Sequence, residues 1–364
     1  MSKKEIKILI LGNGFDLAHG LPTSYIDFIN FVEIFMACIS QVKPESYIVA
    51  FAEEKVGVAG KNYLTELFTN ADKLSIRCEF KELLSENIWY NYFLAKKTRT
   101  GGLWIDFETE ISSVIQAIYS LAIAFKDEEA WKKSQQILVP HIFSDCPKQF
   151  NDLLKKRDIL ITDLRKFARA LELYLEDFVN RIPVLKRIPE IYNNKFDKVI
   201  CFNYTNTYER LYQKDEKTSI EYIHGKTQSI STVEKCNLVL GIDEFLDTTE
   251  DDIDTEFIEF KKFYQRIWNN TSGSYIKWIE DIEQNKLVAH IFIYGHSLDK
   301  TDKDILCPFI NLELGRIKIY HHTKQAFGNQ IKKLVKLLGE ANLILKVYEN
   351  RIEFIQQEEL INDK

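Results

Sequence analysis

Apolar residues along the chain fall into three zones that differ in spacing. Residues 5–16 begin with an apolar run that ends at Leu11 and continue into a loop that contains two glycines. This pattern predicts one buried strand followed by a turn. Residues 24 to about 195 repeat their apolar positions at helical spacing. Residues 196–358 alternate short apolar runs with longer polar segments, which predicts strands alternating with helices and therefore a mostly parallel sheet.

Three long helices are predicted in the middle zone. Their apolar stripes run from Tyr25 to Phe35, across Leu103–Lys126, and from about Phe150 to Asn180. Stripes of this kind favour core packing, although the same helices can also roof a substrate pocket.

Short strands are predicted through the last zone, with helices at Thr207–Tyr212 and Gln325–Leu338. The final two strands are separated only by Glu349-Asn350, which is typical of a hairpin. The predicted strands are Lys198–Phe202, Glu221–Ile223, Leu238–Leu240, Ala289–Tyr294, Arg316–Tyr320, Leu343–Tyr348 and Arg351–Ile355. We therefore expect a Rossmann-like α/β fold with a large helical insertion after the first strand. Residues 1–34 and 196–364 would form the nucleotide-binding domain, and residues 35–195 the insertion.

Composition narrows the class of protein. The 364 residues carry 48 basic and 54 acidic side chains, a formal net charge of −6, which argues against nucleic-acid binding through overall charge. Nine acidic residues fall within 243–259; we interpret this stretch as a solvated loop or lid, with a metal site as the weaker alternative. No cysteine pair has zinc-ribbon spacing, and no apolar stretch approaches the ~18 residues of a membrane span. We expect a cytoplasmic protein with reduced thiols and no membrane association.

Small or polar residues follow six of the predicted strands. Ligands of open parallel sheets bind beyond the carboxyl ends of the strands, so six such ends together predict a single crevice. The six ends begin at Gly12, Asn203, His224, Gly241, Gly295 and His321.

The loop after the first strand reads Gly12-Asn13-Gly14-Phe15-Asp16. Glycines let backbone amides approach a phosphate closely. The dinucleotide-binding fingerprint requires a third glycine where this chain has Leu17, so an ordinary dehydrogenase is excluded. A tight strand–helix turn is the alternative for the glycines, and Asp16 either caps that turn or binds a ribose hydroxyl.

The next two ends carry candidate chemistry. Asn206 and Glu209 have capping-box spacing, which leaves Asn203 and Thr205 facing the crevice. Asn203 would orient a water or a ribose hydroxyl, or simply form the turn. His224, just before Gly225, ends an apolar strand and can act as a general base; a structural hydrogen bond is the alternative.

Three further segments are polar. Gly295-His296-Ser297-Leu298-Asp299, with Asp302 and Asp304 beyond, is suited to sugar hydroxyls or a second phosphate, or forms a glycine turn with an Asp cap. His321-His322 is interpreted as a polar strand end. The acidic residues of Trp104–Glu108 lie at a helix start, where they favour the helix dipole.

These blocks resemble the AbiH family of bacterial phage abortive-infection proteins. The similarity implies a role in phage defence. It is carried, in family order, by Gly12–Tyr25, Trp104–Glu108, Phe202–Thr205 with Glu209, His224-Gly225, and Tyr294–Asp299 with Asp302.

A more distant resemblance is to the sirtuin-like NAD-binding domains of bacterial immune proteins. It implies that Gly12 and Gly14 face a diphosphate, that Asn203 holds the attacking water or the ribose, and that His224 is the base. Gly295, Ser297 and Asp299 would flank the adenosine half. The remaining expected nucleotide contacts are Asn13, Asp16, Thr205, Gly225, His296 and Asp302. The cysteine quartet that binds zinc in sirtuins is missing, which argues against protein deacylation.

The leading hypothesis is an antiphage effector that binds NAD or a related nucleotide and hydrolyses its nicotinamide–ribose bond. Nicotinamide leaves as a neutral ring through an oxocarbenium-like transition state, so we expect no metal. The alternatives are a sensor that binds a small-molecule nucleotide without turnover, and an effector that cleaves nucleic acid with a metal held by Asp299, Asp302 and Asp304. A phage-derived trigger and self-association both remain open.

Overall fold

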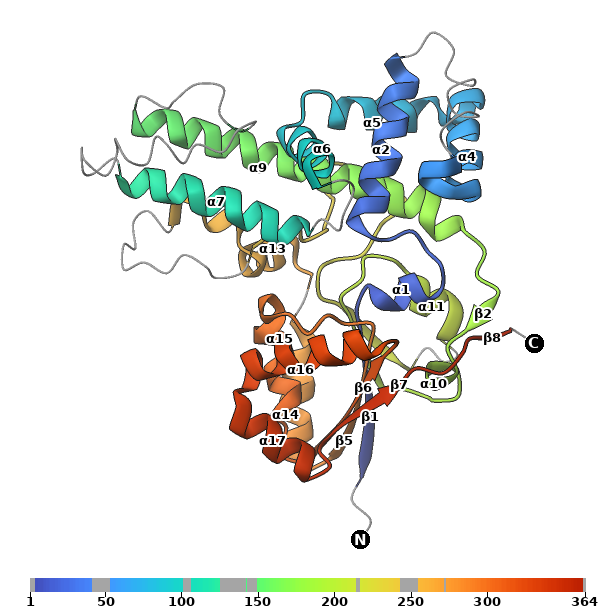
Figure 1. Cartoon of the computed structure of the whole chain (residues 1–364), viewed down its shortest axis with the longest axis vertical. Helices are drawn as coiled ribbons and strands as arrows, with labels where there is room; N and C mark the ends of the chain where they lie inside the picture. Colours follow the sequence, from blue (N-terminus) through green and yellow to red (C-terminus); the bar gives the residue numbers. More distant parts are fainter. Residues whose placement is uncertain are drawn as a thin grey trace. The chain divides into compact units, whose positions relative to one another are not determined.

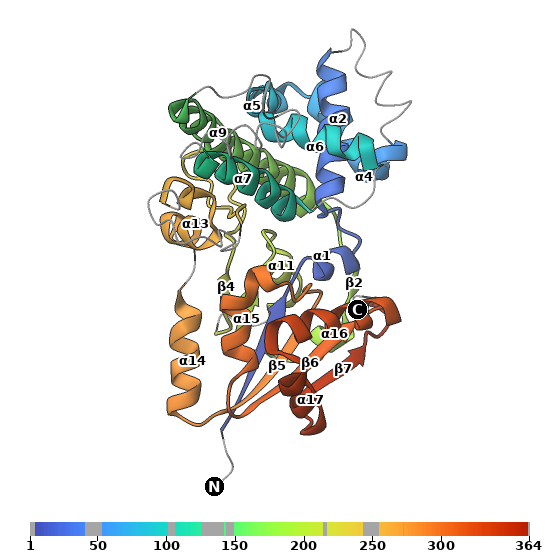
Figure 2. The ribbon, with the colours of Figure 1, turned by 60° about the vertical axis from the view of Figure 1, so that its left-hand side comes forward.

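The computed structural model describes residues 4–40, 53–100, 106–124, 142, 149–213, 217–242, 255–271 and 273–362. The chain divides into two compact units. Unit 1 comprises Met1–Pro22, Pro183–Lys226 and Asn270–Lys364, and unit 2 comprises Thr23–Ile182 and Thr227–Asn269. The described part of unit 1 contains a twisted sheet with helices on its faces, and that of unit 2 is largely helical (Figures 1 and 2).

Unit 1 is built on a six-stranded parallel sheet with the order β4-β3-β1-β5-β6-β7. If these six strands are renumbered along the chain, the order becomes 3-2-1-4-5-6, that of the Rossmann fold. The predicted fold class, including the helical insertion after the first strand, is confirmed. The strands are β1 (Glu5–Leu11), β3 (Lys198–Cys201), β4 (Ser219–Tyr222), β5 (Val288–Tyr294), β6 (Gly315–His321) and β7 (Ile352–Gln356).

Both faces of this sheet are buried, which explains why its strands read as continuous apolar runs. Ile8 and Ile10 face one core, where α14 (Ser274–Gln284), α15 (Lys303–Ile310), α16 (Lys324–Leu338) and α17 (Glu340–Tyr348) pack. Leu9 and Leu11 face the other core, with α1 (Gly14–Ala18), α10 (Pro189–Tyr192) and α11 (Thr207–Tyr212). The two-residue alternation of each strand thus supplies two separate cores.

Unit 2 is held together by an aromatic core. Phe28 and Phe31 on α2 contact Tyr174, and Phe93 stacks on Phe107 with ring centroids 4.1 Å apart. The predicted third helix changes to a π-helical turn at Tyr174–Phe178. The helices of unit 2 are α2 (Tyr25–Ser40), α4 (Glu53–Thr69), α5 (Leu74–Leu84), α6 (Ile88–Thr100), α7 (Phe107–Ala124), α9 (Phe150–Leu173) and α13 (Lys262–Asn269).

Two predicted strands are wrong. Residues 343–348 belong to α17, and β7 pairs with β6 in parallel, so there is no hairpin at Glu349-Asn350. A parallel neighbour requires a crossover connection, which α16 and α17 provide. Residues 238–240 form no strand; the chain makes only an isolated bridge there, between Ile242 and Lys261.

The division into units also differs from the predicted boundaries. Unit 1 leaves its first segment at Pro22 rather than at residue 34, because Phe28 and Phe31 pack into the aromatic core of unit 2. It resumes at Pro183 rather than 196, since β2 (Lys186–Arg187) pairs with β8 (Ile361–Asn362). Residues 227–269, which we had placed in the α/β domain, belong to unit 2. Most of the acidic stretch, residues 243–254, lies outside the described residues.

Within the described ranges, no helix combines the length and the apolar character needed to cross a bilayer. The five described cysteines are free thiols; Cys38 and Cys201 are buried in unit 2 and unit 1 respectively.

Candidate functional site

Five of the six polar strand ends lie at one edge of the sheet in unit 1. They follow β1, β3, β4, β5 and β6, whose carboxyl ends point the same way because the strands are parallel. The sixth, Gly241, belongs to unit 2. A Cβ at Gly241 would lie 2.7 Å from the Phe260 carbonyl oxygen, so that glycine serves close backbone packing there.

The glycines at the β1–β5 switch point bring two loops into backbone contact. The Gly12 amide donates to the Tyr294 carbonyl at 3.1 Å, and the Gly14 amide donates to the Gly295 carbonyl at 2.9 Å. Gly295 has a φ of 67°, and a Cβ there would lie 2.2 Å from the Phe15 nitrogen. The sirtuin-like resemblance implies that Gly12 and Gly14 face a diphosphate. The fold uses their amides internally, so a diphosphate at this loop needs other donors.

Asp16 is fully buried at the carboxyl edge. Its Oδ2 accepts a hydrogen bond from the Thr205 hydroxyl at 2.6 Å, and the Thr207 hydroxyl donates to Thr205 at 3.0 Å. Burial raises the pKa of Asp16 to about 6, although these hydroxyls and the nearby Asn203 amide favour the charged form. The side chain therefore changes charge near neutral pH, where an acid–base group is most effective.

Asn203, two residues beyond the end of β3, is 5% exposed. Its amide is near enough to Asp16 to favour the charged carboxylate. Neither polar atom of this amide makes a hydrogen bond of normal geometry within the described part of the chain. Buried amides normally find partners, so Asn203 is a candidate for binding something that the chain does not supply.

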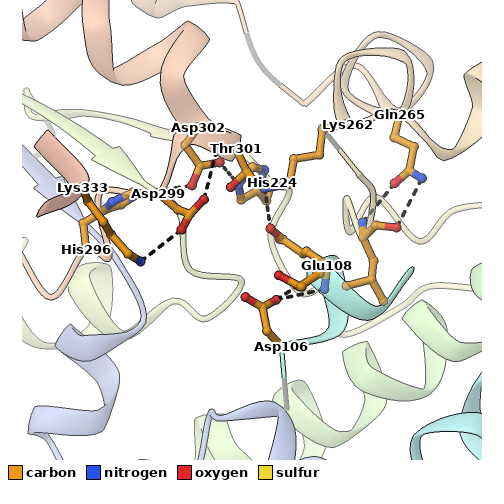
Figure 3. A network of polar contacts seen from close by, with 12 residues as sticks. Asp106, Glu108, His224, Lys262, Gln265, His296, Asp299, Thr301, Asp302 and Lys333 are labelled. Atoms are coloured by element: carbon orange, nitrogen blue, oxygen red, sulfur yellow. Dashed lines mark hydrogen bonds and ion pairs between the residues drawn. The ribbon is translucent and has the colours of Figure 1, made fainter. Parts of the chain in front are cut away.

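A second buried cluster joins the ends of β4 and β5. Asp302 lies between two histidines: its Oδ1 is 3.2 Å from His224 Nε2, and its Oδ2 is 3.6 Å from His296 Nε2 (Figure 3). All three residues are at most 7% exposed. Both imidazole rings pack edge-on against Phe202, with centroids 5.4 Å and 4.3 Å away. The carboxylate and the phenyl ring together fix the orientation of both imidazoles.

The hydrogen bonds assign tautomers to this cluster. The Leu298 amide donates to His296 Nδ1 at 2.9 Å, so the proton of a neutral His296 is on Nε2, facing Asp302. In a neutral His224, a proton donated from Nε2 to Asp302 leaves the lone pair on Nδ1. Leu298 itself has a φ of 57° and is fully buried. That unfavourable backbone conformation at a site is tolerated only because the surroundings enforce it.

The other residues predicted near Gly295 have separate roles. Asp299 caps a short 3₁₀ turn and forms an ion pair with Lys333 at 3.1 Å. Partial burial works against its charged form, but Lys333 and the Thr301 amide hold the pKa of Asp299 below its ordinary value. Ser297 is exposed, and Gly225 forms the turn after β4 with a φ of 83°.

The predicted capping box of α11 is not formed, whereas an acidic residue caps the start of α7. Asn206 occupies the N-cap of α11 without a side-chain cap, and Glu209 pairs with Lys226 instead of closing a capping box. In unit 2, Asp106 does cap the start of α7 by accepting from the Glu108 and Thr109 amides. Glu108 pairs with the buried Lys262 at 2.7 Å (Figure 3). Trp104 lies outside the described residues.

His19, which the sequence analysis did not assign to the site, has a structural role in unit 1. Its Nδ1 donates to the Phe15 carbonyl at 2.7 Å, and the Tyr212 hydroxyl donates to its Nε2 at 2.7 Å. The Tyr212 oxygen also accepts from the Ile188 amide. Burial lowers the pKa of His19 to about 4, so this residue stays neutral and braces α1 against α11.

Sequence reasoning missed the residues that support the candidate site. Thr207 completes the hydroxyl chain to Asp16, Phe202 orients both histidines, and Lys333 neutralises Asp299. None has a distinctive motif, and their roles follow only from the register of the strands. No group of three or more His, Cys, Asp or Glu side chains in the described ranges is arranged to hold a metal ion.

The parallel sheet with a polar carboxyl edge defines unit 1 as a Rossmann-like α/β fold. A family model for bacteriophage abortive infection AbiH matches residues 8–317. The chain therefore belongs to the AbiH family of phage abortive-infection proteins. Comparisons with curated proteins and with solved structures gave no match.

Proposed function

We propose that this AbiH protein binds NAD or a related nucleotide and hydrolyses its nicotinamide–ribose bond during abortive infection. The observation that carries the proposal is the His224–Asp302 pair at the carboxyl edge of a Rossmann-type sheet. A histidine held by a buried carboxylate is the usual arrangement of a general base. The distant sirtuin-like resemblance of the same strand ends agrees with an NAD substrate.

The reaction makes limited demands on the chain. Water adds to the anomeric carbon of the ribose while the bond to the nicotinamide nitrogen breaks, and the ring leaves with that electron pair. One proton of the water passes to His224, and Asp302 stabilises the resulting imidazolium. Asn203 orients the water or the ribose. The proposed reaction consumes only NAD and water, and the products are nicotinamide and ADP-ribose.

The direct test measures nicotinamide release from NAD by mass spectrometry, with purified protein and in phage-infected cells. His224→Gln should reduce turnover at least ~100-fold, the range expected for losing a general base. Asp302→Asn should give a smaller loss, because the imidazole loses its orientation but not its basic nitrogen. His322→Gln is the matched control, since His322 follows another strand of the same sheet and is exposed.

Two outcomes would contradict the proposal. One is an absence of nicotinamide release from wild-type protein in both settings, and the other is full turnover by His224→Gln. Saturable NAD binding with unchanged ligand mass would favour the sensor alternative, which the deep burial of His224 also supports. The nucleic-acid-cleaving alternative has less support, because Asp299 is paired with Lys333 and Asp302 lies between two histidines.

A further inference from the structure

Three polar side chains in unit 1, two buried and one partly buried, have buried atoms with unsatisfied hydrogen bonds at the end of the sheet formed by β1, β3 and β4. These atoms are Asp16 Oδ1, both polar atoms of the Asn203 amide and the Tyr222 hydroxyl. None makes a hydrogen bond of normal geometry within the described ranges, although the Asn203 amide lies within reach of Asp16 and the Tyr222 hydroxyl within reach of Glu209. A buried polar group without a partner costs about 1–3 kcal/mol. Three such side chains at the ends of adjacent strands are therefore suited to a ligand that would supply the missing partners.

The strand register and one hydrogen bond bring these groups to the same end of the sheet. Leu11, Cys201 and Tyr222 are paired in one row across β1, β3 and β4. Asp16, on α1, is bonded to Thr205, which follows the end of β3. Asn203 lies two residues beyond Cys201, and the Cys201 thiol donates to its carbonyl. Tyr222 is on β4, the strand beside β3. Burial raises the pKa of its phenol, and Glu209, Asp16 and their neighbours raise it further.

The chemistry of the three groups selects the ligand. A carboxylate oxygen accepts hydrogen bonds, whereas an amide and a phenol both donate and accept. A vicinal diol matches this set, because its hydroxyls donate to the carboxylate and accept from the amide or the phenol. A phosphate matches less well, since it would meet the Asp16 charge, and Lys226, which lies over the Tyr222 ring, is already paired with Glu209.

We infer that Asp16, Asn203 and Tyr222 form a subsite for the vicinal diol of a ribose. The inference rests on the proposed function, because the nucleotide supplies the sugar. It goes further by adding Tyr222 and by assigning the sugar to the β1–β3–β4 end of the sheet. Thr205 and Thr207 then act as positioning residues, because they hold the Asp16 carboxylate from the side opposite its unpartnered oxygen.

The first test uses calorimetry with ADP-ribose and with analogues that lack one hydroxyl of either ribose. Wild-type protein should prefer a diol over the matching deoxy sugar by at least ~10-fold, the loss expected for hydrogen bonds to a charged group. Asp16→Asn and Tyr222→Phe should each bring that ratio towards one. Asp281→Asn and Tyr348→Phe are the matched controls, as both residues are exposed and lie on other helices.

Weaker binding of wild-type protein to an analogue that lacks a hydroxyl on one ribose supports the subsite. The ribose whose hydroxyl matters is the one that the subsite holds. A wild-type ratio near one, or full retention of the ratio in both variants, would overturn it and leave buried water as the only occupant. Circular dichroism checks that the variants fold. If Asp16→Asn does not, the wild-type ratio and Tyr222→Phe still decide the question.

A second measurement separates this inference from the proposed reaction. Methyl β-D-ribofuranoside and its 2-deoxy counterpart carry no nicotinamide, adenine or diphosphate. Saturation-transfer NMR should detect the diol compound on wild-type protein and not on Asp16→Asn. Failure to detect it would overturn the subsite even if NAD were hydrolysed. Detection without NAD turnover would leave the subsite standing and refute the hydrolase.

Discussion

The two units bury charged side chains to the same depth but treat them differently. In unit 2, Arg169 is 4% exposed and pairs with both Glu79 and Glu172, while the opposite oxygen of Glu172 accepts from the Gln228 amide. Asp177 in the same unit accepts from Tyr63, Lys73 and Arg181. In unit 1, Asp16 is equally buried, yet one of its oxygens has no partner in the described part of the chain.

This contrast distinguishes buried charges that stabilise the fold from buried charges that are available to bind a ligand. A buried ion pair with every oxygen occupied has compensated its desolvation, and removing either partner exposes the full penalty. A buried carboxylate with an unpartnered oxygen still carries part of that penalty, which a bound group can relieve. Burial by itself therefore does not identify a functional residue; burial with missing partners does.

The largest expected effect comes from breaking the satisfied network of unit 2. Arg169→Met removes the cation that pairs with Glu172, which is 0% exposed and would keep the Gln228 amide and the Cys236 thiol. The free energy of unfolding should therefore fall by about 3–5 kcal/mol. Urea denaturation measures this loss. Arg165→Met is the control on the same helix, because its pair with Glu259 is exposed and should contribute less than ~1 kcal/mol.

A double variant makes that test specific. Arg169→Met combined with Glu172→Gln removes the unpaired charge and should recover part of the stability. Equal losses in the single and double variants would mean that packing of the Arg169 side chain, rather than the buried charge, determines the effect.

Replacing Asp16 should change the free energy of unfolding by less than replacing Arg169 does, and in the opposite direction at neutral pH. Its folded-state pKa of about 6 lies above the ordinary 3.8, so the native state binds more protons than the unfolded state between these values. Stability therefore falls as pH rises through this window and levels off above pH 6, with a total loss of about 3 kcal/mol. Asp16→Asn removes the titration, and its stability relative to wild type should rise by that amount between low and neutral pH.

Thermal or urea unfolding at several pH values checks this difference. Asp281→Asn, which changes an exposed carboxylate of the same unit, should show no such rise. If the relative stability of Asp16→Asn stayed constant with pH, the carboxylate would not be strained in the folded state, and the contrast between the units would lose its basis.

Much of the fold followed from apolar spacing. The helices at Thr207–Tyr212 and 324–338 and most strands of the sheet were predicted, because a strand buried on both faces is a continuous apolar run. The wrong prediction at residues 343–348 has a physical cause. The apolar residues there fit the spacing of a strand as well as that of a helix, and the helix follows only from the parallel pairing of β7 with β6. The unit boundary at Pro22 depends on contacts of Phe28 that no local pattern reports.

The sequence predicted that the candidate site lies at the carboxyl edge of the sheet, but it did not predict the contacts between the side chains there. Strand ends pointed to Asn203, His224 and His296, since parallel topology brings such ends together. The pairing of His224 with Asp302 depends on where two loops fold back, and residues 78 positions apart carry no spacing signal. Tyr222 read as an ordinary strand residue. The two glycines assigned to a phosphate bring two loops into backbone contact. A missing Cβ permits either kind of close approach, so the phosphate role stays a prediction.

The smallest expected effect lies at the partly exposed ion pair of unit 1. Asp299 and Lys333 are 42% and 34% exposed, so solvent and salt screen their attraction. Lys333→Met should lower the free energy of unfolding by less than ~1 kcal/mol at low salt and by less still at 1 M salt. The neighbouring Lys332→Met is the control, as that side chain is exposed.

The lowered pKa of Asp299 means that the ion pair between Asp299 and Lys333 contributes to stability at neutral pH and that this contribution is lost on acidification. A loss as large as that of Arg169→Met would place this pair with the structural network of unit 2, and burial would then be a poor guide to which charges hold the fold.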